Sequence, residues 1–215
     1  MQSLDHLSKY FSEFSEVQLS QLAALKDLYA QWNTKINVIS RKDMENFYVR
    51  HVLHSLSIAA EFEFTKGMNV MDLGCGGGFP GIPLAIFFPE VQFHLVDSIN
   101  KKLKIVRAVA DATGLKNIST QHTRAEDITG SKFDVIVSRA VAPLKDLWQW
   151  SKPLLRKNLS KNKGNGCPNG LICLKGGDLA PEISASNCKP LIWEIEKIFI
   201  EDFFKEKYLL YIPLK

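Results

Sequence analysis

The chain has 215 residues, of which 46% are hydrophobic and 23% are charged. These proportions are typical of globular domains and exclude disordered and fibrous proteins. Its 27 basic and 23 acidic side chains leave a formal net charge of +4, which is compatible with an acidic partner without requiring one.

Three absences narrow the class of function further. No apolar run approaches the roughly 20 residues that a membrane-spanning helix needs, and the first residues lack the basic head and apolar stretch of a signal peptide. The cysteines form no C-x-x-C pair and have no histidines at zinc spacing. We therefore expect a cytoplasmic protein with reduced thiols, no membrane contact and no metal site. The four cysteines are Cys75, Cys167, Cys173 and Cys188.

The first sixty residues are predicted to be helical. Apolar side chains recur every three or four residues over residues 4–14, over 19–32 and again from about Asp43 to about Ala60, as a half-buried helix requires. Asn33 ends the second helix, and Asp43 is a candidate N-cap of the third. We divide the chain into this N-terminal helical segment, residues 1–62, and a larger α/β domain, residues 63–215, on which it packs.

The larger domain alternates strands and helices. Five β-rich runs lie at residues 68–73, 91–97, 117–123, 133–139 and 170–175, with helical stretches at 99–113 and from 144 to about 155. Such alternation predicts right-handed crossovers and a mainly parallel sheet. The last two runs, 193–201 and 207–212, have no helix-length segment between them and predict an antiparallel pair at one edge. Residues 158–170 have the composition of a solvated loop.

The most informative segment directly follows the first strand. It places Asp72 two residues ahead of three alternating glycines, Gly74, Gly76 and Gly78, and it ends at Gly81. Glycines permit positive φ and let a ligand approach bare backbone, and the helix that follows has free N–H groups at its start. We therefore predict a cofactor loop at the carboxyl edge of the sheet, where open α/β folds bind ligands.

The spacing of the glycines discriminates between cofactors. The dinucleotide fingerprint G-x-G-x-x-G, begun at Gly74, requires a glycine where this chain has Phe79. The pattern D-x-G-x-G-x-G instead resembles the first motif of class I S-adenosylmethionine-dependent methyltransferases. A glycine-rich structural turn and a nicotinamide-dependent reductase remain the alternatives.

Three other strand ends carry candidate binding residues. Asp97 ends the second strand, 23 residues after Gly74, where a carboxylate suits a ribose diol or caps the next helix. The third strand is followed by residues 124–127, whose main chain and carboxylates suit an adenine edge, although a surface turn is the simpler alternative. Residues 138–143 follow the fourth strand and lack the Asp/Asn-Pro-Pro-aromatic motif of enzymes that methylate exocyclic amines. The acceptor is therefore expected to have a free lone pair.

These segments together resemble the glucose-inhibited division protein B family, over about residues 25–176. The resemblance lies in N-V-I-S-R, Y-V-R-H-V-L-H-S-L, M-D-L-G-C-G-G-G-F-P-G-I-P-L-A-I, L-V-D-S-I-N-K-K-L-K-I-V-R-A-V, T-R-A-E-D and F-D-V-I-V-S-R-A-V-A-P-L-K-D-L. It implies a class I, Rossmann-like methyltransferase fold that uses S-adenosylmethionine to methylate N7 of a guanine in 16S ribosomal RNA. It makes residues 63–215 the S-adenosylmethionine-binding domain. It assigns cofactor contacts to Gly74, Phe79, Ala125, Glu126 and Arg139, to which the loop and strand-end arguments add Gly76, Gly78 and Asp97.

The chain departs from the family at two places. His54 stands where the family segment R-H-I-x-D-S has an acid, and the loop at 158–170 is longer than is typical before the L-K-G strand. Guanine N7 carries no proton, so methyl transfer to it needs alignment and not a general base. This accounts for the absence of a recognisable catalytic pair in the sequence.

Basic residues suggest where RNA binds. Residues 141–175 contain seven basic side chains and one acid, Asp146, which suits phosphate contact or a solvated face. The expected partner is 16S RNA or the small ribosomal subunit, bound by a monomer. Alternative functions are methylation of a small molecule or protein on the same fold and RNA binding without catalysis. Candidate substrate contacts are Asn37, Arg50, His51 and Lys175.

Overall fold

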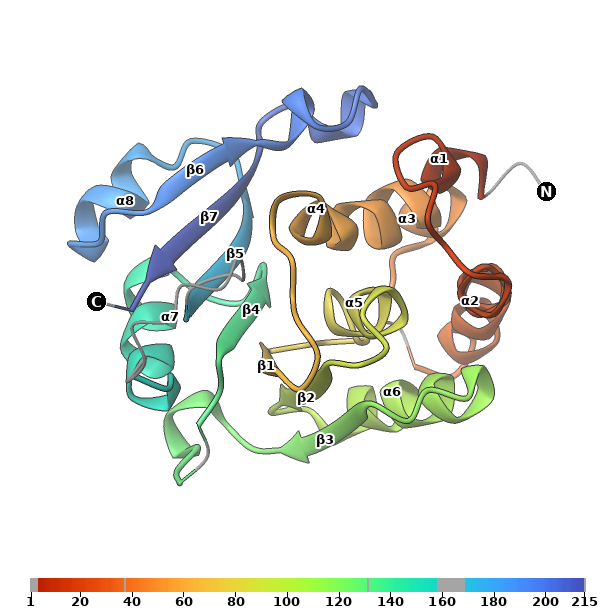
Figure 1. The fold of residues 1–215 in the computed structure, drawn as a ribbon, viewed down its shortest axis with the longest axis horizontal. Helices are drawn as coiled ribbons and strands as arrows, with labels where there is room; N and C mark the ends of the chain where they lie inside the picture. The colour runs from red at the N-terminus through yellow and green to blue at the C-terminus, as the bar shows by residue number, and fades with distance from the viewer. Residues whose placement is uncertain (1–3, 37, 131, 158–168, 215) are drawn as a thin grey trace.

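The computed structural model describes residues 4–36, 38–130, 132–157 and 169–214 (Figure 1). Asn37 and most of the predicted loop at 158–170 lie outside these ranges. A seven-stranded sheet in the order β3-β2-β1-β4-β5-β7-β6 forms the centre. Strands β1 to β5 are parallel, whereas β7 is antiparallel to both β5 and β6. The predicted mainly parallel sheet with an antiparallel edge pair is thereby confirmed.

The elements follow the predicted order. The strands are β1 Asn69–Leu73, β2 Gln92–Asp97, β3 Ile118–His122, β4 Val135–Arg139, β5 Gly170–Gly176, β6 Leu191–Glu194 and β7 Lys207–Pro213. The α-helices are α1 Asp5–Ser8, α2 Glu16–Asn33, α3 Arg41–Glu45, α4 His54–Glu61, α5 Gly81–Phe87, α6 Asn100–Thr113, α7 Leu144–Ser151 and α8 Ala180–Ser186, with a π-helical turn at Tyr48–Leu53.

The sheet separates two hydrophobic cores. Successive strand residues point to opposite faces, so Val135 and Val137 pack with α2, α4, α5 and α6, whereas Ile136 packs with α7. Figure 1 shows α1 to α6 on one side of the sheet and α7 and α8 on the other. By the same alternation, Arg139 lies on the face of α5, and Lys175 in β5 lies on the face of α7 and α8.

Several predicted boundaries are wrong, each because tertiary packing overrode the local pattern. The helix predicted over 4–14 ends at Ser8, because Phe11 and Phe14 instead pack against Phe87 at 5.3 and 5.5 Å between ring centroids. The third helix is capped by Ser40, whose hydroxyl accepts from the N–H of Asp43, and is not capped by Asp43 itself.

The C-terminal region also differs from the prediction. The strand predicted over 193–201 is β6 at Leu191–Glu194, because its pairing with β7 stops there and the chain turns to bury Ile195 and Phe199. Helix α8 was not predicted, since seven residues are too few for a helical period to be recognised.

The N-terminal helices support the glycine loop. The hydroxyl of Tyr29 in α2 donates to the carbonyl of Gly77 at 2.5 Å, and the amide of Gln18 donates to the carbonyls of Ile86 and Phe87 at the end of α5. The N-terminal helical segment therefore holds the glycine loop in place from the α5 side of the sheet.

Candidate functional site

The loop after β1 is closed by its own acid. Oδ2 of Asp72 accepts the N–H of Gly81 at 2.8 Å, while Gly74, Gly76 and Gly78 have φ of 70°, 56° and 100°, values that favour glycine. Asp72 is fully buried, and burial raises its pKa to about 7. Its other oxygen, Oδ1, is buried without a hydrogen-bond partner among the described residues, so the loop contains an unused acceptor.

Asp97 joins this loop to the end of β2. Its Oδ2 accepts the N–H of Gly76 and its Oδ1 accepts the N–H of Ile99, both at 2.8 Å. Asp97 does not cap α6, whose N-cap is Ile99 and has no side-chain cap. The hydrogen bond from the N–H of Ile99 closes the turn that precedes α6. Each carboxylate oxygen of Asp97 retains a second lone pair for a ligand.

A cavity of about 360 Å³ lies at the carboxyl edge of the sheet. The structure brings four predicted cofactor residues to its wall: Gly74, Asp97, Ala125 and Glu126. They come from the ends of β1, β2 and β3, which meet because parallel strands present their carboxyl ends at one edge. The remaining lining is Leu73, Val96, Ser98, Ile99, Lys102, Thr123, Arg124, Ala140, Val141 and Trp150.

Phe79 and Arg139 lie behind the loop and do not line this cavity. The guanidinium of Arg139 is 5.2 Å from the ring centroid of Phe79 and donates to Nδ1 of His51 at 3.0 Å. Phe79 is buried against Tyr29 and His51, each 4.9 Å away between ring centroids. Four of the sequence-predicted cofactor residues thus line the cavity, whereas Phe79 and Arg139 contact the N-terminal segment, and Gly76 and Gly78 shape the loop without lining the cavity.

Burial dominates the electrostatics of the second group. Desolvation lowers the pKa of Arg139 to about 10, partly opposed by Asp72, and lowers the pKa of His51 to about 3, assisted by Arg139. His51 is therefore neutral near pH 7 and accepts a hydrogen bond through Nδ1. Its Nε2 is buried with no partner in the described chain.

The π-helical turn presents Arg50 and His51 toward this cluster. Arg50 pairs with Asp43 at 2.6 Å and lies over Phe203, 5.4 Å from the ring centroid. His54, at the position of the family's acid, is buried against Phe203 and Phe204. Burial lowers its pKa well below the ordinary value, so a neutral imidazole occupies the place where the family resemblance implies a carboxylate.

The other predicted substrate contacts are placed differently. Asn37 lies outside the described residues. Lys175 does not face open solvent, because its ammonium pairs with Glu182 at 2.6 Å and its side chain is 11% exposed. Of the basic cluster at 141–175, Arg156 pairs with Asp134, and Lys161 and Lys163 lie in the undescribed part.

Several residues of the site could not be found from the sequence. Ile99, Val141 and Trp150 line the cavity with apolar surface, but no motif singles them out. Tyr29 fixes the glycine loop from a helix 48 residues away. Its apolar helical period indicates burial only.

The residues present fit an S-adenosylmethionine site. The cavity lies within the range of about 300–1,000 Å³ typical of small-molecule sites, and it combines apolar walls with the carboxylates of Asp97 and Glu126. A side chain at Gly74 would collide with Val141, with a Cβ only 2.5 Å from its nearest carbon. The glycine therefore keeps the wall of the cavity open to a ligand.

The described part of the chain contains no group of three or more His, Cys, Asp or Glu side chains arranged to hold a metal ion. Within it, Cys75, Cys173 and Cys188 are unpaired. No helix in that part has both the length and the apolar character needed to cross a membrane.

Comparisons with known proteins agree with this geometry. A protein of Phocaeicola vulgatus named ribosomal RNA small subunit methyltransferase G is 54% identical over 98% of this chain and 99% of its own length. One of the same name from Parabacteroides distasonis is also 54% identical, over 97% of this chain and 88% of its own. A crystal structure of an S-adenosylmethionine-dependent methyltransferase from Aquifex aeolicus shares the fold, with a TM-score of 0.56 and 13% identity over 75% of this chain and 89% of that chain.

The family model described as rRNA small subunit methyltransferase G matches residues 18–207. This range includes the helices that support the glycine loop, the cavity at the strand ends and the antiparallel edge of the sheet. The chain therefore belongs to the GidB family of S-adenosylmethionine-dependent methyltransferases.

Proposed function

We propose that this protein transfers the methyl group of S-adenosylmethionine to N7 of a guanine in 16S ribosomal RNA. The observation that supports this most strongly is the cavity that joins Gly74, Asp97 and residues 125–126 at the carboxyl edge of the sheet. The names of the relatives, which specify small-subunit ribosomal RNA, supply the substrate class. Guanine N7 comes from the family resemblance and agrees with the missing amine motif after β4.

The residues around the cavity suit binding and alignment. Asp97 holds the glycine loop and offers its remaining lone pairs to a ribose diol, and Ile99 and Val141 offer apolar surface to a nucleoside. S-adenosylmethionine supplies an electrophilic methyl group on a sulfonium centre. Because guanine N7 has a free lone pair, the protein has to orient the acceptor and exclude water, without removing a proton.

The lining of the cavity agrees with a reaction that needs no base. None of its described residues is a histidine or a cysteine. His51 cannot serve as a base through Nδ1, because that atom accepts from Arg139, and its Nε2 is buried. We propose that His51 and Arg139 support the glycine loop and the part of the site that receives the RNA.

We propose that RNA approaches over the π-helical turn, where Arg50 is about a quarter exposed. Charge reversal, Arg50→Glu, is expected to raise the KM for RNA and to leave the affinity for S-adenosylhomocysteine close to that of the wild type. Binding should weaken steeply with salt, because cations released from phosphates favour association. We place the reaction in the cytoplasm, where small subunits are assembled, and expect a monomer.

Methyl transfer to RNA from a strain that lacks this gene product tests the proposal. Small subunits and purified 16S RNA are incubated with protein and S-adenosylmethionine, and the nucleosides are identified by mass spectrometry. The expected product is 7-methylguanosine, absent with the Asp97→Ala variant. Methylation of a different atom would correct the acceptor, and a lack of any transfer to either RNA would refute the proposal.

A further inference from the structure

One ion pair holds the segment between β4 and α7, residues 140–143, at the main chain of Ala142 and at that of Leu144, the first residue of α7. Nζ of Lys175 in β5 donates to the carbonyl of Ala142 at 2.6 Å, and it pairs with Oε1 of Glu182 in α8 at the same distance. Oε1 of Glu182 also accepts the N–H of Leu144 at 2.6 Å. We call residues 140–143 the β4–α7 loop.

The other end of this loop is held by helix α7, because the carbonyl of Pro143 accepts the N–H groups of Asp146 and Leu147, both at 3.0 Å. Ala140 has φ of 54°, a backbone conformation that residues other than glycine rarely adopt. Pro143 precedes α7 and offers no side-chain cap, so the first N–H of that helix depends on Glu182. Contacts from β5 and α8 thus contribute to the conformation of the loop.

The loop also forms part of the cavity. Ala140 and Val141 belong to its lining, and the side chain of Val141 closes over Gly74. A shift of the loop would therefore change the wall that faces the cofactor, even though neither Lys175 nor Glu182 lines the cavity.

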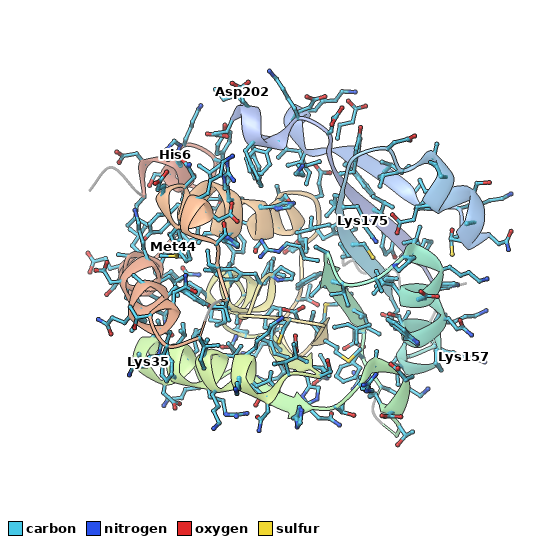
Figure 2. The ribbon with its side chains drawn as sticks, turned by 180° about the vertical axis from the view of Figure 1, so that it is seen from behind. His6, Lys35, Met44, Lys157, Lys175 and Asp202 are labelled. Atoms are coloured by element: carbon cyan, nitrogen blue, oxygen red, sulfur yellow. The ribbon has the colours of Figure 1, made fainter. Side chains whose placement is uncertain are left out.

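The position of Lys175 argues against direct contact with RNA. Its side chain is 11% exposed and that of Glu182 is 25% exposed. In Figure 2, Lys175 lies inward of the labelled Lys35 and Lys157, which project at the outline of the molecule. Helices α7 and α8 lie together on its side of the sheet (Figure 1).

We propose that Lys175 and Glu182 are positioning residues that hold the β4–α7 loop in the shape that binds the cofactor. This inference rests on the proposed function, because it takes the cavity to be the S-adenosylmethionine site. The pair acts through its polarity, since the ammonium faces a carbonyl oxygen and the carboxylate faces an N–H group. Reversing the two charges would preserve their mutual attraction but would set a carboxylate against the oxygen of Ala142.

The experiment compares Lys175→Met, Glu182→Gln and the swap Lys175→Glu/Glu182→Lys with wild type. The matched control is Glu194→Gln/Lys197→Met, which removes an exposed ion pair of the same residue types. Calorimetry gives the Kd for S-adenosylhomocysteine, and steady-state kinetics on small subunits give KM and kcat. Thermal unfolding reports stability separately.

We expect both single variants to raise the Kd for S-adenosylhomocysteine and the KM for S-adenosylmethionine about tenfold, a size typical of residues that act through others. The KM for RNA and the affinity of the control should stay at wild-type values. The swap should be no better than the single variants, whereas Lys175→Arg should restore binding because it can donate to both acceptors. Where Lys175→Met does not fold, Glu182→Gln tests the pair through its other main-chain contact, the N–H of Leu144.

Three results would overturn the inference. Variants that lose only thermal stability or kcat, with unchanged Kd, would make the pair merely structural. A wild-type Kd in the swap Lys175→Glu/Glu182→Lys would show that attraction between the two charges is enough to hold the loop. A rise in the KM for RNA alone would restore Lys175 as an RNA contact. If the wild type itself binds no S-adenosylhomocysteine, both this inference and the proposed function fail. If the wild type binds it and the variants behave in one of the three ways above, only the inference fails.

Discussion

Asp97 and Gly76 are joined by a hydrogen bond of 2.8 Å, in which the carboxylate of the β2 end accepts the main-chain N–H of the glycine loop. The other oxygen of the same carboxylate accepts from Ile99. One side chain therefore joins the glycine loop to the turn before α6, beside the cavity.

The first prediction follows from this bond. In Asp97→Asn only one of the two N–H groups can keep an oxygen acceptor, so we expect the Kd for S-adenosylhomocysteine to rise roughly tenfold to a hundredfold, as loss of a hydrogen bond to a charged group implies. Calorimetry measures it. The exposed Asp111→Asn is the control, and an unchanged Kd in Asp97→Asn would contradict the assigned role.

The second prediction separates two glycines of the loop. A Cβ at Gly76 would meet no atom within 4 Å, whereas one at Gly74 would lie 2.5 Å from Val141. We expect Gly76→Ala to lose about 1 kcal/mol of unfolding free energy from its positive φ. Gly74→Ala should lose more and should also bind S-adenosylhomocysteine more weakly.

Urea unfolding and calorimetry on the two variants test this difference. The double variant Gly74→Ala/Val141→Ala should recover part of the loss, because the smaller side chain removes the collision. Equal losses of unfolding free energy in Gly74→Ala and Gly76→Ala would show that backbone strain, and not the collision with Val141, causes the loss.

The third prediction concerns the buried acid. The folded pKa of Asp72 is raised to about 7 from an ordinary 3.8, so its contribution to stability is fully present below pH 4 and is lost as the pH rises through 7. Asp72→Asn avoids this loss. We expect the variant to exceed the wild type at pH 8 by roughly 2 to 4 kcal/mol, with the difference vanishing near pH 4.

Urea unfolding at pH 4 and pH 8 measures this difference. A variant less stable than the wild type at pH 8 would show that the contact to Gly81 outweighs the burial of the charge.

The fourth prediction uses the depressed pKa of His51, about 3 in the folded state against an ordinary 6.5. The unfolded chain binds a proton below pH 6.5 that the folded protein excludes, so this contribution to stability falls as the pH drops from 6.5 toward 3. Gln at this position does not titrate. Between pH 7.5 and 5.5 the wild type should lose about 1 kcal/mol relative to His51→Gln.

Parallel unfolding series for wild type, His51→Gln and the exposed control His122→Gln test this sign. A constant difference between wild type and His51→Gln across the range would mean that His51 is accessible to protons when folded.

Much of the cavity could be predicted from the sequence, because its residues follow strand ends. Gly74, Asp97, Ala125 and Glu126 come after three parallel strands, whose carboxyl ends must meet at one edge. A motif and a strand period therefore suffice to place them together.

The sequence could not predict which of the candidate residues line the cavity and which pack against other elements. The motifs group Phe79 and Arg139 with the cofactor residues, yet Phe79 packs against Tyr29 and His51, and Arg139 donates to His51. The sequence groups Lys175 with the basic surface, yet its side chain is mostly covered and held in an ion pair with Glu182. Strand alternation tells which residues share a face, but not which helices cover that face.

The sequence by itself determined the parallel sheet, the cofactor loop and the family, because these depend on local periodicity and on motifs within short segments. The tertiary structure alone decided that Tyr29 supports the loop, that His51 accepts from Arg139, and that Lys175 and Glu182 hold the β4–α7 loop. Each of these contacts joins different elements across the fold. Their partners are chosen by packing and burial, which no local pattern records.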